Sequence, residues 1–257
     1  MSHDTLESET FDCPHAMNLA TLPIEVRRPK RYRKVPMRKV EMGKYVVYNS
    51  PLVNRLMAPR YRYKIDPGQL CAMVSFIDAT RGSESVIAEV GVAQGDSSVF
   101  MLEHLVTTGD ERTLYLFDTF SGFTKSSIEH EVQVRNKSKR EYDRFRYGDE
   151  HRLQKNLYNL GYERFRTIKG DASGYMWSSL LPIGAMLLDI DLYQPTIDVL
   201  EAVYPNLIEG GGIVLDDCLP DTPWDGSLQA YEEFISRHGL PFERVGKKGA
   251  IIRAAVK

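Results

Sequence analysis

Two apolar stretches of the sequence end in paired aspartates. AMLLDID, residues 185–191, ends with Asp189 and Asp191, and GGIVLDD, residues 211–217, ends with Asp216 and Asp217. Clustered carboxylates repel one another and raise one another's pKa unless a cation compensates. Ligand sets made only of oxygen favour a hard divalent ion, Mg²⁺ first, with Ca²⁺ or Mn²⁺ possible. The pattern therefore indicates a metal site, and the alternative is that each aspartate only caps the turn or helix after it.

The spacing within each pair restricts how the carboxylates could meet. Asp189 and Asp191 are two residues apart, so in a continuing strand their side chains would point to the same side. Asp216 and Asp217 are adjacent, so both reach one site only if the chain turns there. We expect such a turn after residue 215.

A second group of residues at predicted strand ends suits a cofactor. EVGVAQGDSS, residues 89–98, places Glu89, Gly91 and Gly95 between a strand and a helix. Glycine allows close approach to the backbone, and a helix N-terminus offers free N–H groups. An acidic residue before this turn favours a cofactor with an amino group over one with two phosphates. Asp118 could accept hydrogen bonds from ribose hydroxyls, and Asp171 from an adenine amine. The alternative for the glycines is a tight strand-to-helix turn.

The elements that must position these residues alternate between strand and helix. Apolar runs predict five strands at 85–92, 113–118, 165–171, 185–191 and 211–217. Helical spacing predicts helices that begin at Asp66 and at residues 96, 149, 195 and 227. This α/β pattern predicts a mostly parallel sheet with helices on both faces. Two short closing strands, joined at Gly246 to Gly249, must be antiparallel to each other.

We divide the chain into an N-terminal arm or cap, residues 1–65, and a core, residues 66–257. Residues 121–147 carry many charges without a clear period, so they predict a surface loop or lid over the site. Residues 26–39 are rich in Arg and Lys, which indicates either a patch for nucleic acid or acidic lipid, or a solvated arm.

Composition excludes several classes of protein. The 257 residues are 42% hydrophobic and 26% charged, with a formal net charge of −2, which is typical of a globular protein without a nucleic-acid or membrane partner. The three cysteines are far apart and form no CxxC, so we expect neither a disulfide framework nor zinc, and a cytoplasmic location. Cys71 and Cys218 are expected to be buried.

Four segments of the core resemble the macrocin O-methyltransferase family. They are EVGVAQGDSSVFM, LFDTFSGF, LLDIDLYQPTIDVLEAVYPNLIEGGGIVLDD and KKGAIIR, within residues 85–253. The resemblance implies the seven-stranded, Rossmann-like class I methyltransferase fold, with its last strand antiparallel, in a homodimer that methylates sugar hydroxyls of natural products with S-adenosylmethionine. Ile190 stands where the family usually has Gly.

The resemblance also implies roles for individual residues. Asp189, Asp216 and Asp217 would hold Mg²⁺, and Asp191 would be the general base. The cofactor-binding positions would be Glu89, Gly91, Gly95, Ser97, Asp118 and Asp171. His130 and His151 are rival bases, although each lies in a charged segment typical of a solvated surface.

Three alternatives to sugar methylation stay open from the sequence. The acceptor could be a catechol or another vicinal diol, for which the same metal chemistry would serve. A protein that binds nucleic acid through residues 26–39 belongs to a different class, and salt-dependent binding would reveal it. A nicotinamide-dependent dehydrogenase would bind NAD rather than S-adenosylmethionine.

Overall fold

The computed structural model describes residues 39–51, 53, 61–142, 144–146, 148–180 and 182–255. The chain divides into two compact units, Met1–Arg60 and Tyr61–Lys257. In the first unit, helix α1 spans Lys39–Asn49 and buries none of its residues. The basic arm predicted at 26–39 lies outside the described residues except for Lys39. None of the described helices is long and apolar enough to cross a membrane.

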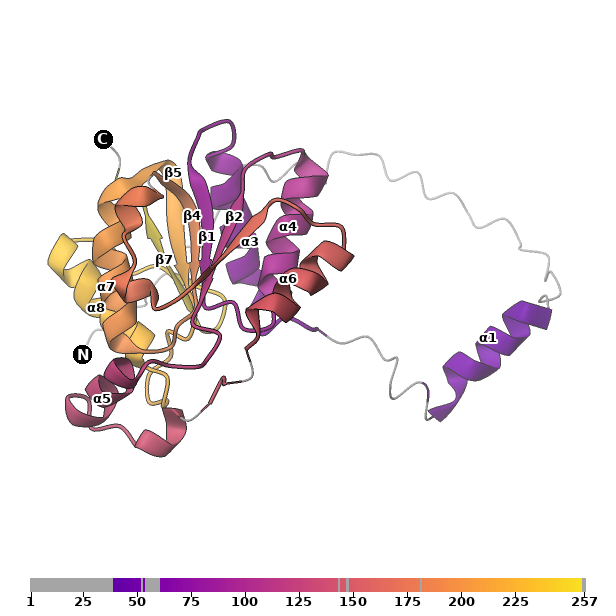
Figure 1. Ribbon diagram of the computed structural model, residues 1–257, viewed down its shortest axis with the longest axis horizontal. Helices are drawn as coiled ribbons and strands as arrows, with labels where there is room; N and C mark the ends of the chain where they lie inside the picture. Colours follow the sequence, from indigo (N-terminus) through magenta and orange to yellow (C-terminus); the bar gives the residue numbers. More distant parts are fainter. Residues whose placement is uncertain are drawn as a thin grey trace, which may run out of the picture. The chain divides into compact units, whose positions relative to one another are not determined.

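The second unit is built on a seven-stranded sheet (Figure 1). The strands are β1 (Val86–Val90), β2 (Leu114–Asp118), β3 (Phe165–Lys169), β4 (Ile183–Leu188), β5 (Leu207–Leu215), β6 (Arg244–Val245) and β7 (Gly249–Arg253). Their order is β3-β2-β1-β4-β5-β7-β6. The first five strands pair in parallel, and β7 is antiparallel to both β5 and β6. The predicted fold is therefore confirmed, including the closing hairpin.

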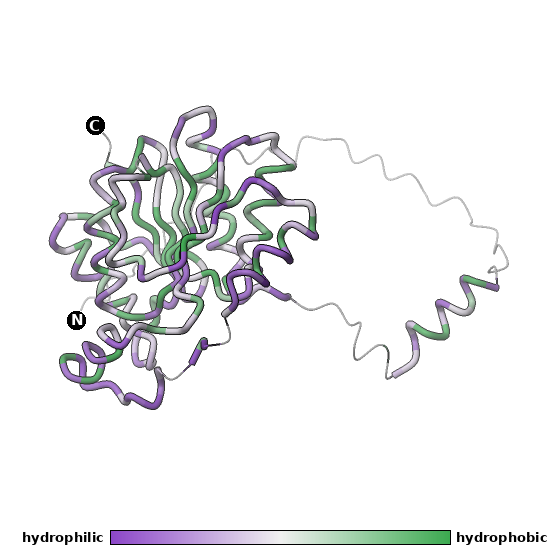
Figure 2. The backbone as a smooth tube through the Cα atoms, viewed as in Figure 1, coloured by the Kyte–Doolittle hydropathy of each residue, from purple (hydrophilic) through white to green (hydrophobic). Residues whose placement is uncertain are grey.

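Helices cover both faces of this sheet, as Figure 1 shows. On one side lie α3 (Pro67–Ala79), α4 (Asp96–Thr108) and α6 (Glu150–Asn159), and on the other lie α7 (Tyr193–Val203) and α8 (Gly226–His238). Each side has its own apolar cluster, and the central strands contribute to both. The strands accordingly form the continuous hydrophobic band at the centre of Figure 2. Strands that bury both faces must be apolar throughout, which is why their sequence runs were predictable.

Helix α3 begins as its sequence predicts, at Asp66 with Pro67 in the first helical position. The backbone N–H of Asp66 donates to Oε1 of Gln69 at 3.1 Å. This capping arrangement satisfies a donor at the helix N-terminus and fixes the Gln69 side chain.

Residues 121–147 are more ordered than the predicted loop. They contain helix α5, Lys125–Gln133, and a short 3₁₀ helix, Lys139–Tyr142. Thr124 caps α5 by accepting a hydrogen bond from the backbone N–H of Ser127. The buried residues of α5 are Ser127 and Glu131, both polar, so hydrophobic periodicity could not reveal the helix.

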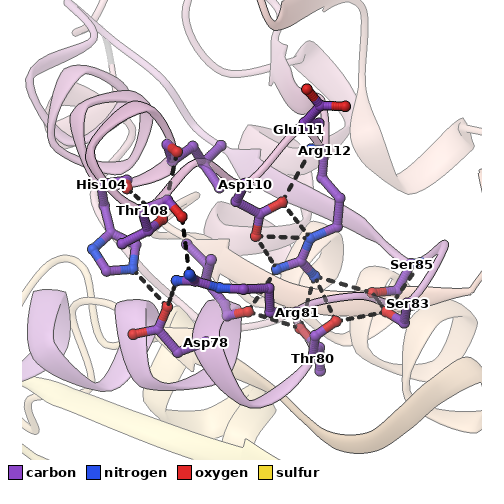
Figure 3. A network of polar contacts seen from close by, with 12 residues as sticks. Asp78, Thr80, Arg81, Ser83, Ser85, His104, Thr108, Asp110, Glu111 and Arg112 are labelled. Atoms are coloured by element: carbon purple, nitrogen blue, oxygen red, sulfur yellow. Dashed lines mark hydrogen bonds and ion pairs between the residues drawn. The ribbon is translucent and has the colours of Figure 1, made fainter.

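A polar network closes the end of the sheet where β1 and β2 begin (Figure 3). Arg112 pairs with Asp110, and its guanidinium donates to the backbone oxygens of Thr80 at 3.1 Å and Ile77 at 2.6 Å. It also reaches the hydroxyl of Ser85. The carboxylate and these oxygens satisfy the buried guanidinium, so we regard this network as structural.

The expectation of two buried cysteines was half wrong. Cys218 is buried, but Cys71 is exposed on α3. Which side of a helix faces solvent follows from its whole pattern of apolar residues, and the tendency of cysteine to be buried does not indicate it.

Candidate functional site

A pocket lies at the carboxyl ends of the parallel strands, where open α/β sheets bind their ligands. Its wall contains six aspartates: Asp118, Asp171, Asp189, Asp191, Asp216 and Asp217. The two aspartate pairs predicted from the sequence therefore share one pocket with some of the predicted cofactor residues, Asp118 and Asp171 among them.

Three of the carboxylates form a compact cluster. Asp189, Asp191 and Asp217 each bring an oxygen within 4.8 Å of the others. β4 ends at Leu188, so Asp189 and Asp191 do not lie in a continuing strand, although their carboxylates do lie close together. Asp191 and Asp217 have φ values of 58° and 54°, in the left-handed region. Aspartate tolerates this region better than most residues, and such backbone outliers concentrate at functional sites. The turn expected at Asp217 is confirmed.

Asp216 does not belong to this compact cluster of three carboxylates. It is buried, and its Oδ1 accepts a hydrogen bond of 2.9 Å from Nε2 of Gln69. Its Oδ2 lies 2.6 Å from Nζ of Lys248, which also contacts Oδ1 of Asp217 at 2.9 Å. Gln69 and Lys248 were missed from the sequence. Both come from elements far along the chain, although Lys248 lies within the KKGAIIR segment.

The electrostatics of the cluster follow from burial and crowding. Burial, and then the charges of Asp216 and Asp217, raise the pKa of Asp189 well above its usual range. Burial and the neighbouring Asp189 do the same to the pKa of Asp191. Burial opposes the charge of Lys248, but the attraction of Asp216 and Asp217 prevails and raises its pKa. Among the described residues, a single ammonium thus faces four carboxylates, and an added cation would relieve their repulsion.

Two glycines allow close approach of the backbone that carries Asp189 and Asp191. A Cβ on Gly91, whose φ is +88°, would lie 1.8 Å from the backbone oxygen of Asp189. A Cβ on Gly226, the first residue of α8, would lie 2.7 Å from the backbone oxygen of Asp191. That oxygen also accepts a 3.2 Å hydrogen bond from the N–H of Ser227. Gly91 was predicted to allow close approach of a ligand, and the structure shows close approach of the backbone of Asp189, which follows β4.

Three of the predicted cofactor residues lie outside the pocket wall. Glu89 is buried, and the hydroxyls of Ser97 and Ser98 donate to its two carboxylate oxygens. Burial raises the pKa of Glu89 to about 7. Gly95 is the N-cap residue directly before α4, and its φ is +86°. Glu89, Gly95 and Ser97 therefore contribute to the structure of the strand-to-helix turn. None of the three belongs to the pocket wall.

Gly91, Asp118 and Asp171 do line the pocket. Asp118 accepts hydrogen bonds at Oδ2 from the N–H groups of Val92 and Ala93, at 2.9 and 3.0 Å. Asp171 accepts two hydrogen bonds from Ser173, both at Oδ1. Its Oδ2 has no hydrogen bond among the described residues. Asp118 thus shapes the glycine turn, while Asp171 retains an oxygen that can accept from a ligand.

The remaining wall of the pocket is apolar and partly comes from the predicted lid. Phe123 and Phe145 line it, and their ring centroids lie 5.5 Å apart. Trp224 packs 5.9 Å from both rings. Ile190, between the paired aspartates, adds a further apolar side chain. The segment 121–147 therefore builds part of the pocket.

Buried charged side chains connect helix α5 to the beginnings of α7 and α8. Glu131 is fully buried and accepts a 2.8 Å hydrogen bond from the N–H of Tyr193. Arg135 pairs with Glu131 and with Asp225, which also receives Lys137 at 2.6 Å. Through Glu131 and Asp225, this cluster connects α5 to the first residue of α7 and to the residue before α8. We call Glu131, Arg135, Lys137 and Asp225 the α5 ion-pair cluster.

The two histidines considered as bases lie elsewhere. The ring of His130 stacks on Tyr193 at 5.3 Å, and His151 is exposed on α6. Neither belongs to the wall of the aspartate pocket.

Comparison with known proteins identifies the family. The sequence profile described as Macrocin-O-methyltransferase (TylF) matches residues 35–253. The chain belongs to this family. It is therefore an O-methyltransferase, EC 2.1.1, and the assignment supports S-adenosylmethionine as its methyl donor.

Two relatives carry the names of O-methyltransferases. The chain is 26% identical over 201 residues to 8-demethyl-8-(2,3-dimethoxy-alpha-L-rhamnosyl)-tetracenomycin-C 4'-O-methyltransferase of Streptomyces olivaceus, covering 74% of this chain and 72% of the relative. It is 27% identical over 191 residues to mycinamicin III 3''-O-methyltransferase of Micromonospora griseorubida, covering 69% of each.

Two solved structures share the fold. The calicheamicin methyltransferase CalS11 superposes with a TM-score of 0.59 at 22% identity, covering 85% of this chain and 94% of that one. The O-methyltransferase NovP gives a TM-score of 0.57 at 18% identity, covering 73% and 78%.

Proposed function

We propose that this O-methyltransferase moves a methyl group from S-adenosylmethionine to a hydroxyl of a sugar on a natural product, with the help of a divalent ion. The observation that carries the proposal is the cluster of aspartates, which lines the same pocket as Gly91 in the strand-to-helix turn after β1. The name of the Streptomyces olivaceus relative includes a rhamnosyl group in its substrate, which supports a sugar as the acceptor.

The donor set fits a hard ion such as Mg²⁺ because every ligand is a carboxylate oxygen. We propose Asp189, Asp216 and Asp217 as the ligands. Lys248 already bridges Asp216 and Asp217, so this pair holds one positive charge between them. Each carboxylate oxygen accepts more than one contact, so the bonds to Gln69 and Lys248 leave Asp216 able to bind. A bound ion would supply positive charge beside the acceptor oxygen as that oxygen loses its proton.

The reaction is an in-line displacement. The acceptor oxygen forms a bond to the methyl carbon while the carbon–sulfur bond breaks, and the electron pair stays on sulfur in S-adenosylhomocysteine. We propose that Asp191 takes the hydroxyl proton, because one of its carboxylate oxygens lies within 4.8 Å of an oxygen of both Asp189 and Asp217, two of the proposed metal ligands. Phe123, Phe145 and Ile190 line the same pocket, and we propose that these apolar side chains limit the access of water to the reacting groups.

The test is a methylation assay read by mass spectrometry on a panel of glycosides and catechols, with S-adenosylmethionine and Mg²⁺. We expect a mass gain of one methyl group on a glycoside, and Asp191→Asn should lower turnover about 100-fold or more, as expected for loss of a general base. Methylation of catechols alone would replace the sugar with the aromatic-diol alternative. Full activity after treatment with EDTA would contradict the metal, and near-normal turnover of Asp191→Asn would contradict the base.

We further propose a homodimer. Helix α1 exposes six large apolar side chains: Val40, Met42, Tyr45, Val46, Val47 and Tyr48. Such a surface is unusual on a monomer and suits burial against a second copy. Sedimentation at micromolar concentration should give twice the mass of the chain, and a monomer would refute it.

A further inference from the structure

The charges on the pocket wall are strongly unequal. Six aspartates line it, and the described cations on the same wall are Lys64 and Lys248. S-adenosylmethionine carries a sulfonium and an ammonium, which suit this acidic wall, but it also carries a carboxylate. That carboxylate needs a cation near it, because aspartates would otherwise repel it.

Lys248 is already engaged. Its ammonium contacts Asp216 at 2.6 Å and Asp217 at 2.9 Å. Lys64, by contrast, makes no hydrogen bond or ion pair with any part of the chain that the structure describes, and it is exposed at the pocket. Of the two described lysines on this wall, Lys64 is therefore the one whose ammonium is available to bind an anion.

The backbone around Lys64 is held on both sides. Tyr61 donates from its hydroxyl to the backbone oxygen of Ile65 at 2.6 Å, and Ile65 is buried in the core. The ring of Tyr63 packs edge-on against Phe100 of α4, with centroids 5.6 Å apart. Helix α4 directly follows the Gly91–Gly95 turn, so these contacts keep the segment beside the turn that the cofactor is proposed to use.

We propose that Lys64 binds the carboxylate of the methionine part of S-adenosylmethionine and so selects the intact donor over analogues without that group. The inference rests on the proposed use of the pocket for this donor. A charge-assisted contact of this kind is among the stronger hydrogen bonds available to a ligand. Lys64 thereby complements the aspartates, which face the positive groups of the same molecule.

The test compares two ligands in calorimetry: S-adenosylhomocysteine, which keeps the carboxylate, and its decarboxylated analogue. For Lys64→Met we expect Kd for S-adenosylhomocysteine to rise about tenfold or more, as loss of a charge-assisted bond implies. Kd of Lys64→Met for the decarboxylated analogue should stay unchanged. The variant Lys64→Arg keeps the positive charge and should retain most of the affinity for S-adenosylhomocysteine. The control is Arg62→Met, an exposed cation of the same segment outside the pocket wall, which should alter neither Kd.

Two results would overturn the inference. If Lys64→Met weakened both ligands equally, the side chain would act on the shape of the pocket rather than on the carboxylate. If it weakened neither, Lys64 would have no role in binding. Failure of the unmodified protein to bind S-adenosylhomocysteine would instead refute the proposed donor, and this result is distinguishable because it precedes any substitution.

Discussion

Gln69 illustrates, at the scale of single residues, how one buried amide links three parts of the site. Its Oε1 accepts from the N–H of Asp66, and its Nε2 donates to Oδ1 of Asp216 and to the backbone oxygen of Leu215, at 2.9 and 3.1 Å. The amide therefore orients a carboxylate that we propose as a metal ligand.

We expect Gln69→Leu to remove the buried donor that serves Oδ1 of Asp216 and the backbone oxygen of Leu215. Such a loss costs about 1–3 kcal/mol of the free energy of unfolding. It should also weaken activation by Mg²⁺, measured as the metal concentration that gives half-maximal turnover. Gln133→Leu, an exposed glutamine at the end of α5, is the control for both measurements. Unchanged metal dependence in Gln69→Leu would show that Gln69 supports only the fold.

Gly91 allows a second prediction with a matched control. Gly91 and Gly161 have nearly the same φ, +88° and +89°, but a Cβ on Gly161 would meet nothing within 4 Å. Gly161→Ala should therefore cost only the backbone strain of about 1–3 kcal/mol. Gly91→Ala should cost clearly more in urea unfolding and abolish methyl transfer, because its Cβ would displace the backbone of Asp189. Equal losses in the two variants would show that the contact with Asp189 is unimportant.

At the scale of elements, α5 is held by charge rather than by apolar contacts. Arg135 is nearly buried and pairs with two carboxylates, Glu131 and Asp225. We expect Arg135→Met to destabilise the protein by about 3–5 kcal/mol, because it leaves buried carboxylates without their partner. Thermal unfolding should show this loss, whereas Arg140→Met, an exposed arginine of the same segment, should leave the melting temperature nearly unchanged. A small effect of Arg135→Met would mean that Lys137 alone can hold Asp225.

The elements also show which features a sequence can predict. The strands were predictable because they bury both faces and so are continuous apolar runs, and α3 was predictable from Asp66 and Pro67. The aspartates were predictable because charge at the end of an apolar run is conspicuous. Gln69 and Lys248 were not, since a glutamine in a helix and a lysine in a hairpin acquire their roles only when the chain folds. Helix α5 was missed because its buried side is polar.

At the scale of the whole molecule, the division at residues 60 and 61 separates the core from α1. Both apolar clusters of the sheet belong to the unit Tyr61–Lys257. Burial of apolar surface is the main stabilising contribution to a domain, so we expect the unit 61–257, which contains both clusters, to fold by itself. The exposed apolar side chains of α1 should instead contribute to association.

A chain lacking residues 1–60 separates these two contributions. We expect it to retain the circular dichroism of the core, to unfold in one cooperative transition and to sediment as a monomer. Its melting temperature should be independent of protein concentration, whereas that of the full chain should rise with concentration, because association stabilises only the folded state. Loss of cooperative unfolding would show that α1 stabilises the core within one chain. A shortened chain that still sedimented as a dimer would place the interface on the core and leave the apolar side chains of α1 to another partner.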